Sequence, residues 1–293
     1  MKTTTDVNFV YFAGEPLGVP VLKELKVAGL LPSLIVCNPD RPVGRKQVLT
    51  APSVKVWAEE NNIDVWQPES FKDQEEVTKK LKDFDLFVVV AYNKILPKWL
   101  IDLPKHSTLN VHPSLLPLLR GASPIRSAIL GDMRDQIGVS IMQLDEKMDH
   151  GPILAQVTMS VHEDNWPVRG TELDEALAHF GGALLADTIP KWITGEVTLT
   201  EQFHDAATYC GRLERAMGEL QIDPRNLPTG SDAYQTLLKI RAFDGFPGTF
   251  FIHNSKRVKV LDATLENDTL KILEVLPEGK NKQSFEHYLS SLD

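Results

Sequence analysis

The feature that most restricts the fold is a regular alternation of strand-like and helix-like segments along residues 1–200. Runs rich in β-branched and aromatic residues are separated by stretches in which apolar residues recur at helical spacing. One run, FVVVA at residues 87–91, is apolar on both faces, which is typical of a central parallel strand covered by helices on both sides. The alternation therefore predicts a doubly wound α/β sheet. The expected strands are residues 7–12, 32–37, 64–66, 85–92, 107–112, 139–144 and 152–161, and the expected helices are 20–29, 53–62, 75–84, 95–103, 123–131 and 171–197.

The texture of the chain changes near residue 200. Residues 201–232 are polar and rich in turn formers, which is typical of a linker. A short amphipathic helix at 233–243 is followed by short alternating runs separated by the turns HNS, ENDT and PEGK. We expect three parts: an α/β domain at 1–200, a linker at 201–232 and a small β domain at 233–293.

Charge and composition limit the partners and the compartment. The net charge of −9 gives no overall attraction to nucleic acid, so a polyanionic partner has to be held by local basic patches. The two cysteines, Cys37 and Cys210, are far apart and lack metal-ligand spacing, which favours a reduced cytoplasmic setting. No run approaches the roughly 18 to 20 apolar residues of a membrane span, and the first residues lack a signal-peptide pattern. We expect a cytoplasmic protein without a membrane partner.

The sequence lacks the motifs of several common classes of enzyme. The glycines of FAGEPLGVP at 12–20 match neither GxGxxG nor GK[ST], which disfavours a nicotinamide or ATP site. No GxSxG nucleophile turn is present. The eight histidines form neither HExxH nor a cluster with cysteine, so we expect no metal.

An amide and an imidazole share one face at the end of an expected strand. In LNVHPSLLP at 109–117, Asn110 and His112 lie two residues apart. Asp149, in the loop LDEKMDHGPIL at 144–154, is the best candidate for a carboxylate beside them, because His150–Gly151 can turn tightly. Amide and imidazolium donors next to a carboxylate suit attack on a carbonyl. The residues alone leave another interpretation open, in which Asn110 caps the strand, His112 is an ordinary buried histidine and Asp149 is a turn residue.

Motifs spread along the chain resemble the formyltransferase family that uses 10-formyltetrahydrofolate, and within it the members that act on methionyl-tRNA. The matching stretches are PVLKEL (20–25), CNPDRPVGRKQVLTAPSVK (37–55), QPES (67–70), VVVAYNKILP (88–97), LNVHPSLLPLLRGASPI (109–125), MDHGPIL (148–154), ATYCGRL (207–213) and KIRAFDGFPGTFF (239–251). The resemblance covers nearly the whole chain. It implies a Rossmann-like formyltransferase domain followed by a small OB-like β-barrel, a monomer, and initiator Met-tRNA and folate as partners.

The resemblance also assigns roles to residues. It implies that Asn110, His112 and Asp149 are the catalytic residues, which act while the methionine α-amine attacks the formyl carbon on N10 of the folate. The folate contacts carried over from the family are Ser114, Leu115, Leu116 and Pro117, together with Tyr92, Asn93, Ile95, Leu96 and Asp145. The tRNA contacts are Arg41, Arg45 and Lys46 of the loop DRPVGRK, and Lys256, Arg257 and Lys259 of the β domain.

Three departures from the family pattern concern the acceptor side. The first loop, GEPLGVP, is shorter than usual, and MDHGPIL is closer to relatives that formylate nucleotides or sugars. The spacing of KRVKVLDA and LKILEVLPEGK predicts a trimmed barrel, down to an open sheet. An N-formyltransferase acting on a dTDP-4-amino sugar therefore remains the alternative, and a folate- or RNA-binding protein without activity is a third interpretation.

Overall fold

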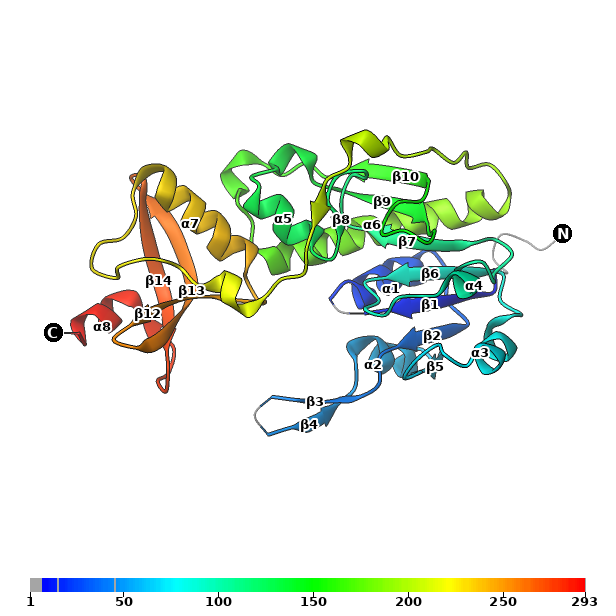
Figure 1. Ribbon diagram of the computed structural model, residues 1–293, viewed down its shortest axis with the longest axis horizontal. Coiled ribbons are helices and arrows are strands. Elements are labelled where there is room, and N and C mark those ends of the chain that lie inside the picture. The colour runs from blue at the N-terminus through cyan, green and yellow to red at the C-terminus, as the bar shows by residue number, and fades with distance from the viewer. Residues whose placement is uncertain (1–6, 15, 45, 293) are drawn as a thin grey trace. The chain divides into compact units, whose positions relative to one another are not determined.

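A computed structural model describes residues 7–14, 16–44 and 46–292 of the chain (Figure 1). Its described residues form two compact units. The first takes its residues from 1–120, 138–159 and 174–209, and the second from 121–137, 160–173 and 210–293. Each unit therefore draws on more than one segment of the chain.

The first unit is built on one mainly parallel sheet, with the strand order β10-β9-β7-β6-β1-β2-β5. From β5 to β7 neighbouring strands are parallel, whereas β9 runs antiparallel to β7 and β10 antiparallel to β9. The strands are β1 (Phe9–Ala13), β2 (Leu34–Cys37), β5 (Asp64–Trp66), β6 (Leu86–Val90), β7 (Thr108–His112), β9 (Gly138–Gln143) and β10 (Ile153–Thr158). The predicted α/β sheet is confirmed, including the central place of the FVVVA strand, because every residue of β6 is buried between β1 and β7.

Helices cover both faces of this sheet. On one face Phe12, Val36 and Val89 pack with residues of α3 (Gln74–Leu81) and α4 (Lys98–Ile101). On the other lie α1 (Gly18–Val27), α2 (Ser53–Glu60) and the long helix α6 (Gly170–Ile193). The hydroxyl of Tyr11, on β1, donates to the carbonyl oxygen of Gly18 in α1.

A glycine pair lets α6 approach its neighbours closely. A Cβ at Gly181 would lie 2.7 Å from Val111 Cγ1, and a Cβ at Gly182 would lie 2.8 Å from Glu24 Cβ on α1. Both distances are below ordinary carbon–carbon contact. The two glycines therefore allow α6 to pack closely against the sheet and α1.

The chain reverses its direction across the sheet between β1 and β6. It proceeds from β1 outward to β2 and β5, and then returns to β6 and β7 on the other side. At the carboxyl ends of β1 and β6 the backbones meet: Gly14 N–H donates to Val90 O at 3.0 Å, and a Cβ at Gly14 would lie 1.9 Å from Ala91 O. Ligands of doubly wound sheets bind at this kind of position, and β7 ends next to it.

The second unit contains an antiparallel sheet in the order β12-β13-β14-β15. Its elements are α5 (Pro124–Leu130), α7 (Gly230–Ala242), β12 (Thr249–His253), β13 (Lys256–Glu266), β14 (Thr269–Pro277), β15 (Gln283–Ser284) and α8 (Phe285–Ser290). Leu237 of α7 packs with Phe251, Val258 and Val275 of the sheet. The predicted OB-like barrel is not confirmed, because no closed barrel forms within the described residues. β15 has only two residues, and the sheet stays open with β12 and β15 at its edges.

Some elements were not expected from the sequence. The loop at 40–46 is part of a hairpin of β3 (Arg41–Val43) and β4 (Val48–Thr50). Arg120–Gly121 (β8) pairs with Tyr209–Cys210 (β11), and α8 follows the last strand. No helix in the described part of the chain combines the length and the apolar character needed to cross a membrane.

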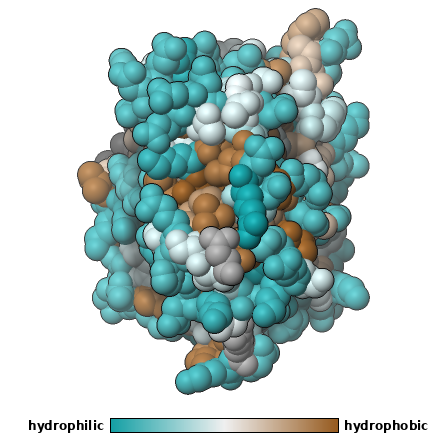
Figure 2. Space-filling model, turned by 90° about the vertical axis from the view of Figure 1, so that its left-hand side faces the viewer, coloured by the Kyte–Doolittle hydropathy of each residue, from teal (hydrophilic) through white to brown (hydrophobic). Residues whose placement is uncertain are grey.

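Hydrophobic side chains also reach the surface. In the face that Figure 2 shows, they gather in a patch surrounded by mainly hydrophilic residues. Within the second unit, Met217, Phe246 and Ile252 are 43%, 50% and 48% exposed. Phe250 is 5% exposed and belongs to the interior, whereas Phe246 does not.

Candidate active site

The candidate site begins at the carboxyl end of β7. Asn110 and His112 are two residues apart on this strand and therefore share a face. Both are buried, with exposed fractions of 9% and 4%. His112 Nε2 lies 3.0 Å from Leu119 O, and since a carbonyl only accepts, Nε2 carries the proton of this contact.

Asp149 reaches His112 from the loop between β9 and β10. Its Oδ1 lies 3.7 Å from His112 Nδ1, and its side chain is 14% exposed. Asp149 has a φ of 48°, an uncommon backbone conformation for a residue other than glycine. The turn is tight at Gly151 as well, because a Cβ there would lie 2.0 Å from Gln143 O. Backbone constraints thus bring together two groups that are distant in sequence.

The spacing of these groups suits an oxygen-containing substrate. A separation of 3.7 Å is longer than a normal hydrogen bond. Nδ1 is therefore open to an oxygen atom that enters beside Asp149, and it donates to that oxygen when the ring is doubly protonated. The side-chain amide of Asn110 makes no hydrogen bond within the described part of the chain, so its N–H donors are available too. The arrangement can stabilise an oxyanion and accept a proton next to it.

The Ser114–Pro117 loop follows directly and is held by two polar side chains of the sheet. Ser140 Oγ accepts from Leu116 N–H at 3.0 Å and donates to Ser114 O at 2.6 Å. Gln156 Nε2 donates to Ser140 Oγ at 2.8 Å and to Leu116 O at 2.9 Å. The loop that we expect to contact folate is thereby fixed beside His112.

The Tyr92–Leu96 segment follows β6, the strand next to β7. Tyr92 packs edge-on against Phe12, with ring centroids 5.7 Å apart. Its buried hydroxyl has no hydrogen-bond partner within the described residues, and burial raises the pKa of Tyr92 above its ordinary value. Leu96 is buried, whereas Asn93 and Ile95 are exposed, Ile95 to 91%. An apolar ring system that offers one polar atom to the Tyr92 hydroxyl would fit this segment.

Asp145 has partners within its own loop. Its Oδ2 lies 2.6 Å from His150 Nδ1, and its Oδ1 accepts from Lys147 N–H at 2.8 Å. The structure therefore brings Asp145 to His150 and brings Asp149 to His112. A direct folate contact by Asp145 stays a prediction.

The predicted tRNA contacts lie on two separate elements. Arg41 is on β3 and Lys46 lies in the turn between β3 and β4, both exposed, whereas Arg45 lies outside the described residues. On β13, Arg257 and Lys259 alternate with the buried Val258 and share an exposed face. Lys256 has the opposite parity, although it is also exposed. The guanidinium of Arg257 lies 3.6 Å from the centroid of the Phe250 ring.

Sequence reasoning missed the polar residues that support the site. Ser140 and Gln156 lie on β9 and β10, and Arg120 and Gln202 are only 2% and 4% exposed. Their side chains contact loops far away in sequence, and no local pattern signals such contacts. The one available signal was the Arg120–Gly121 pair inside a matching motif.

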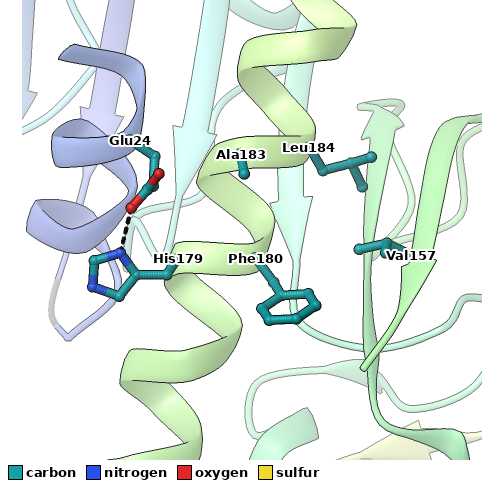
Figure 3. A pocket seen from close by; sticks show the side chains of 6 residues that line it. All are labelled: Glu24, Val157, His179, Phe180, Ala183 and Leu184. Atoms are coloured by element: carbon teal, nitrogen blue, oxygen red, sulfur yellow. Dashed lines mark hydrogen bonds and ion pairs between the residues drawn. The ribbon is translucent and has the colours of Figure 1, made fainter. Parts of the chain in front are cut away.

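A surface pocket of about 440 Å³ lies elsewhere in the first unit (Figure 3). The lining combines Glu24 of α1 and Val157 of β10 with His179, Phe180, Ala183 and Leu184 of α6. His179 Nδ1 and Glu24 Oε1 form an ion pair at 2.6 Å, and the rest of the lining is mainly apolar. No candidate site residue lines this pocket.

Metal ligands do not gather in the described residues: no three His, Cys, Asp or Glu side chains form a group that could hold an ion. The expectation that no metal takes part stays a prediction.

Comparisons with known proteins agree along nearly the whole chain. A family model described as formyl transferase matches residues 17–189. A methionyl-tRNA formyltransferase from Halalkalibacterium halodurans is 36% identical over 96% of this chain and 93% of its own length. Among solved structures, a methionyl-tRNA formyltransferase from Clostridium thermocellum matches with a TM-score of 0.60, 16% identity, and coverage of 92% of this chain and 98% of that one. An N-formyltransferase from Helicobacter canadensis, in complex with folinic acid and dTDP-3-aminofucose, matches with a TM-score of 0.62, 18% identity, and coverage of 89% and 88%. At these identities the solved structures show the fold alone.

Proposed function

Since the chain belongs to the formyl transferase family, we propose that it transfers the formyl group of 10-formyltetrahydrofolate to the α-amine of methionine on initiator Met-tRNA. The observation that supports Met-tRNA as the acceptor is the similarity, over 96% of this chain, to a methionyl-tRNA formyltransferase at 36% identity. The amino-sugar alternative rests on a neighbour at 18% identity and on the motif MDHGPIL.

In the proposed mechanism the side chains at the β7 end act on a tetrahedral intermediate. The methionine amine attacks the formyl carbon, a C–N bond forms, and the carbonyl oxygen becomes an oxyanion. Asn110 Nδ2–H and the protonated imidazole of His112 stabilise this oxyanion. Asp149 takes the proton that the amine loses, directly or through water, and relays it toward N10 as the C–N10 bond breaks. Holding both substrates at the same strand ends supplies the proximity that the reaction needs.

The folate is assigned to the two loops beside this point. Ser114, Leu115, Leu116 and Pro117 border His112, and the segment with Tyr92, Asn93, Ile95 and Leu96 follows the neighbouring strand β6. The buried hydroxyl of Tyr92 is a ready partner for a polar atom of the pterin. Asp145, which lies on the same loop as Asp149, is the remaining proposed folate contact.

We propose that residues 1–200 form the catalytic domain and that residues 201–232 are a linker. Residues 233–293 form a second domain that binds the tRNA backbone through Lys256, Arg257 and Lys259. The small domain is proposed to be an open variant of the OB-like fold. The same proposal includes a monomer in the cytoplasm, where initiator tRNA is charged.

The proposal is tested by incubating the purified protein with 10-formyltetrahydrofolate and either charged or uncharged initiator tRNA. Formylmethionine should be recovered after deacylation of the charged sample only, because the reaction needs the free amine. Consumption of the formyl donor without formylmethionine would contradict the proposal.

Replacing both Arg41 and Lys46 by glutamine should raise KM for Met-tRNA and leave kcat nearly unchanged. Each cation that contacts a phosphate adds about one unit to the slope of log affinity against log salt. We therefore expect the double variant to reduce this slope by about two. Steady-state kinetics over a range of salt concentrations measure the effect.

The control is the double variant Lys23→Gln with Lys72→Gln, which removes two exposed charges outside the β3–β4 hairpin. It should keep the salt slope of the unmodified protein. Equal slopes for the two double variants would show that the hairpin does not contact tRNA.

A further inference from the structure

A buried arginine occupies the interior of the first unit directly after the His112 contact. Arg120 is 2% exposed and follows Leu119, the residue whose carbonyl meets His112 Nε2. Its Nε and Nη2 donate to Gln202 Oε1 at 3.1 and 2.6 Å, and Nη2 also donates to His204 Nδ1 at 2.8 Å. Burying a guanidinium requires such partners, because an unsatisfied charge in the interior is costly.

The other end of the Gln202 amide points to the loop of Asp149. Gln202 Nε2 donates to Asp149 O at 3.0 Å and to Gly151 O at 2.7 Å. The oxygen thus accepts two hydrogen bonds and the nitrogen donates two, so the partners determine the orientation of the amide. Gln202 is 4% exposed, so water competes little for these bonds.

These two carbonyls flank the turn that directs the Asp149 carboxylate. The φ of 48° at Asp149 lies in the left-handed region, which is disfavoured for a residue with a Cβ. Hydrogen bonds from one rigid donor group to both sides of the turn oppose its relaxation. Asp149 Oδ1 stays 3.7 Å from His112 Nδ1 only while this turn is kept.

The neighbouring imidazoles add to the same assembly. The rings of His150 and His204 stack with centroids 4.0 Å apart and planes inclined by 5°. His204 is bound to Arg120, and His150 is bound to Asp145. The loop that carries Asp149 is therefore attached to Arg120 through Gln202 and through the stacked rings.

We propose that Gln202 is a positioning residue for formyl transfer: anchored on Arg120, its amide holds the Asp149–Gly151 turn so that the carboxylate faces His112. The inference rests on the proposed function, because it acts through the proposed catalytic pair. Gln202 itself does not touch the substrates.

A merely structural role would confine Gln202 to accepting hydrogen bonds from the buried guanidinium of Arg120. The two roles use different atoms, since Oε1 serves Arg120 and Nε2 serves the turn. The variant Gln202→Glu separates them. A carboxylate pairs well with the guanidinium, but it offers no donor to the carbonyls of Asp149 and Gly151 and sets an oxygen against them.

The experiment measures stability and kinetics of Gln202→Glu, with Gln136→Glu, at an exposed position of the second unit, as control. We expect Gln202→Glu to fold and to lower kcat by about 10- to 100-fold, because displacing a reacting group by about 1 Å costs this much. The KM values for both substrates should change by less than about threefold. The control should keep the kcat of the unmodified protein.

A double-mutant cycle then shows whether the effect passes through Asp149. In an Asp149→Ala background, Gln202→Glu should lower single-turnover rates by less than about twofold, since the group being positioned is gone. A full multiplicative loss in that background would overturn the inference, and so would an unchanged kcat of Gln202→Glu in an active protein. If the unmodified protein fails to formylate Met-tRNA, the proposed function fails first and the inference falls with it.

Discussion

Replacing His112 by alanine is expected to lower kcat for formylation of Met-tRNA by about 10²- to 10⁴-fold, the usual contribution of a positioned proton-handling group. The imidazole is 4% exposed, its Nε2 donates to Leu119 O at 3.0 Å, and its Nδ1 lies 3.7 Å from Asp149 Oδ1. A water molecule that replaced the imidazole as hydrogen-bond donor would not be held in the same orientation. The KM values should change little, because in the proposed mechanism the ring acts on the intermediate rather than on the bound substrates.

Stability has to be measured on the same variant. Removal of the ring takes away its hydrogen bond to Leu119 O, and the loss of one such bond costs about 0.5 to 1.5 kcal/mol of folding free energy. Urea unfolding therefore accompanies single-turnover kinetics. His162→Ala, at a side chain that is 73% exposed, is the control and should keep full activity. A folded His112→Ala protein with near-normal turnover would remove His112 from the mechanism.

The second large effect is expected at Asn110. Asn110→Ala removes the N–H donor that we propose to stabilise the oxyanion, and the loss of one such donor lowers kcat by about 10²- to 10³-fold. Asn110→Asp is the sharper variant. It preserves the shape of the side chain but replaces the donor by a negatively charged acceptor, so we expect a loss at least as large.

Both Asn110 variants are compared by pre-steady-state formylation with saturating substrates. Asn267→Asp, at the exposed turn between β13 and β14, introduces the same charge change elsewhere and should leave kcat unaltered. If Asn110→Asp retained normal kcat, the amide would be a structural residue of β7, as the other interpretation of the sequence holds.

Hydrophobic periodicity predicted the first unit well, because burial there follows from local pattern. The fully apolar β6 is central, as its sequence predicted. The β3–β4 hairpin was missed because all of its described residues are exposed, so no apolar alternation marks it. The barrel was predicted from resemblance and is not confirmed, whereas the short spacing of the last strands already indicated a trimmed, open sheet.

Within the site, strand parity alone was enough to predict that Asn110 and His112 share one face of β7. The approach of Asp149 to His112 depends on a backbone with positive φ and on close contact at Gly151, and the turn residues made it a reasonable hypothesis. Gln202 gave no such signal. Its proposed role depends on two contacts of one amide, because Oε1 accepts from Arg120 and Nε2 donates to Asp149 O. Only the folded chain brings these residues together.

Competition between acceptors decides whether this site formylates the amine of Met-tRNA. Labelled 10-formyltetrahydrofolate is given to the protein together with equal concentrations of initiator Met-tRNA and a dTDP-4-amino sugar, and the products are separated. We expect label on methionyl-tRNA, abolished in the His112→Ala protein, and none on the sugar. Label on the sugar nucleotide and none on the tRNA would contradict the proposed function.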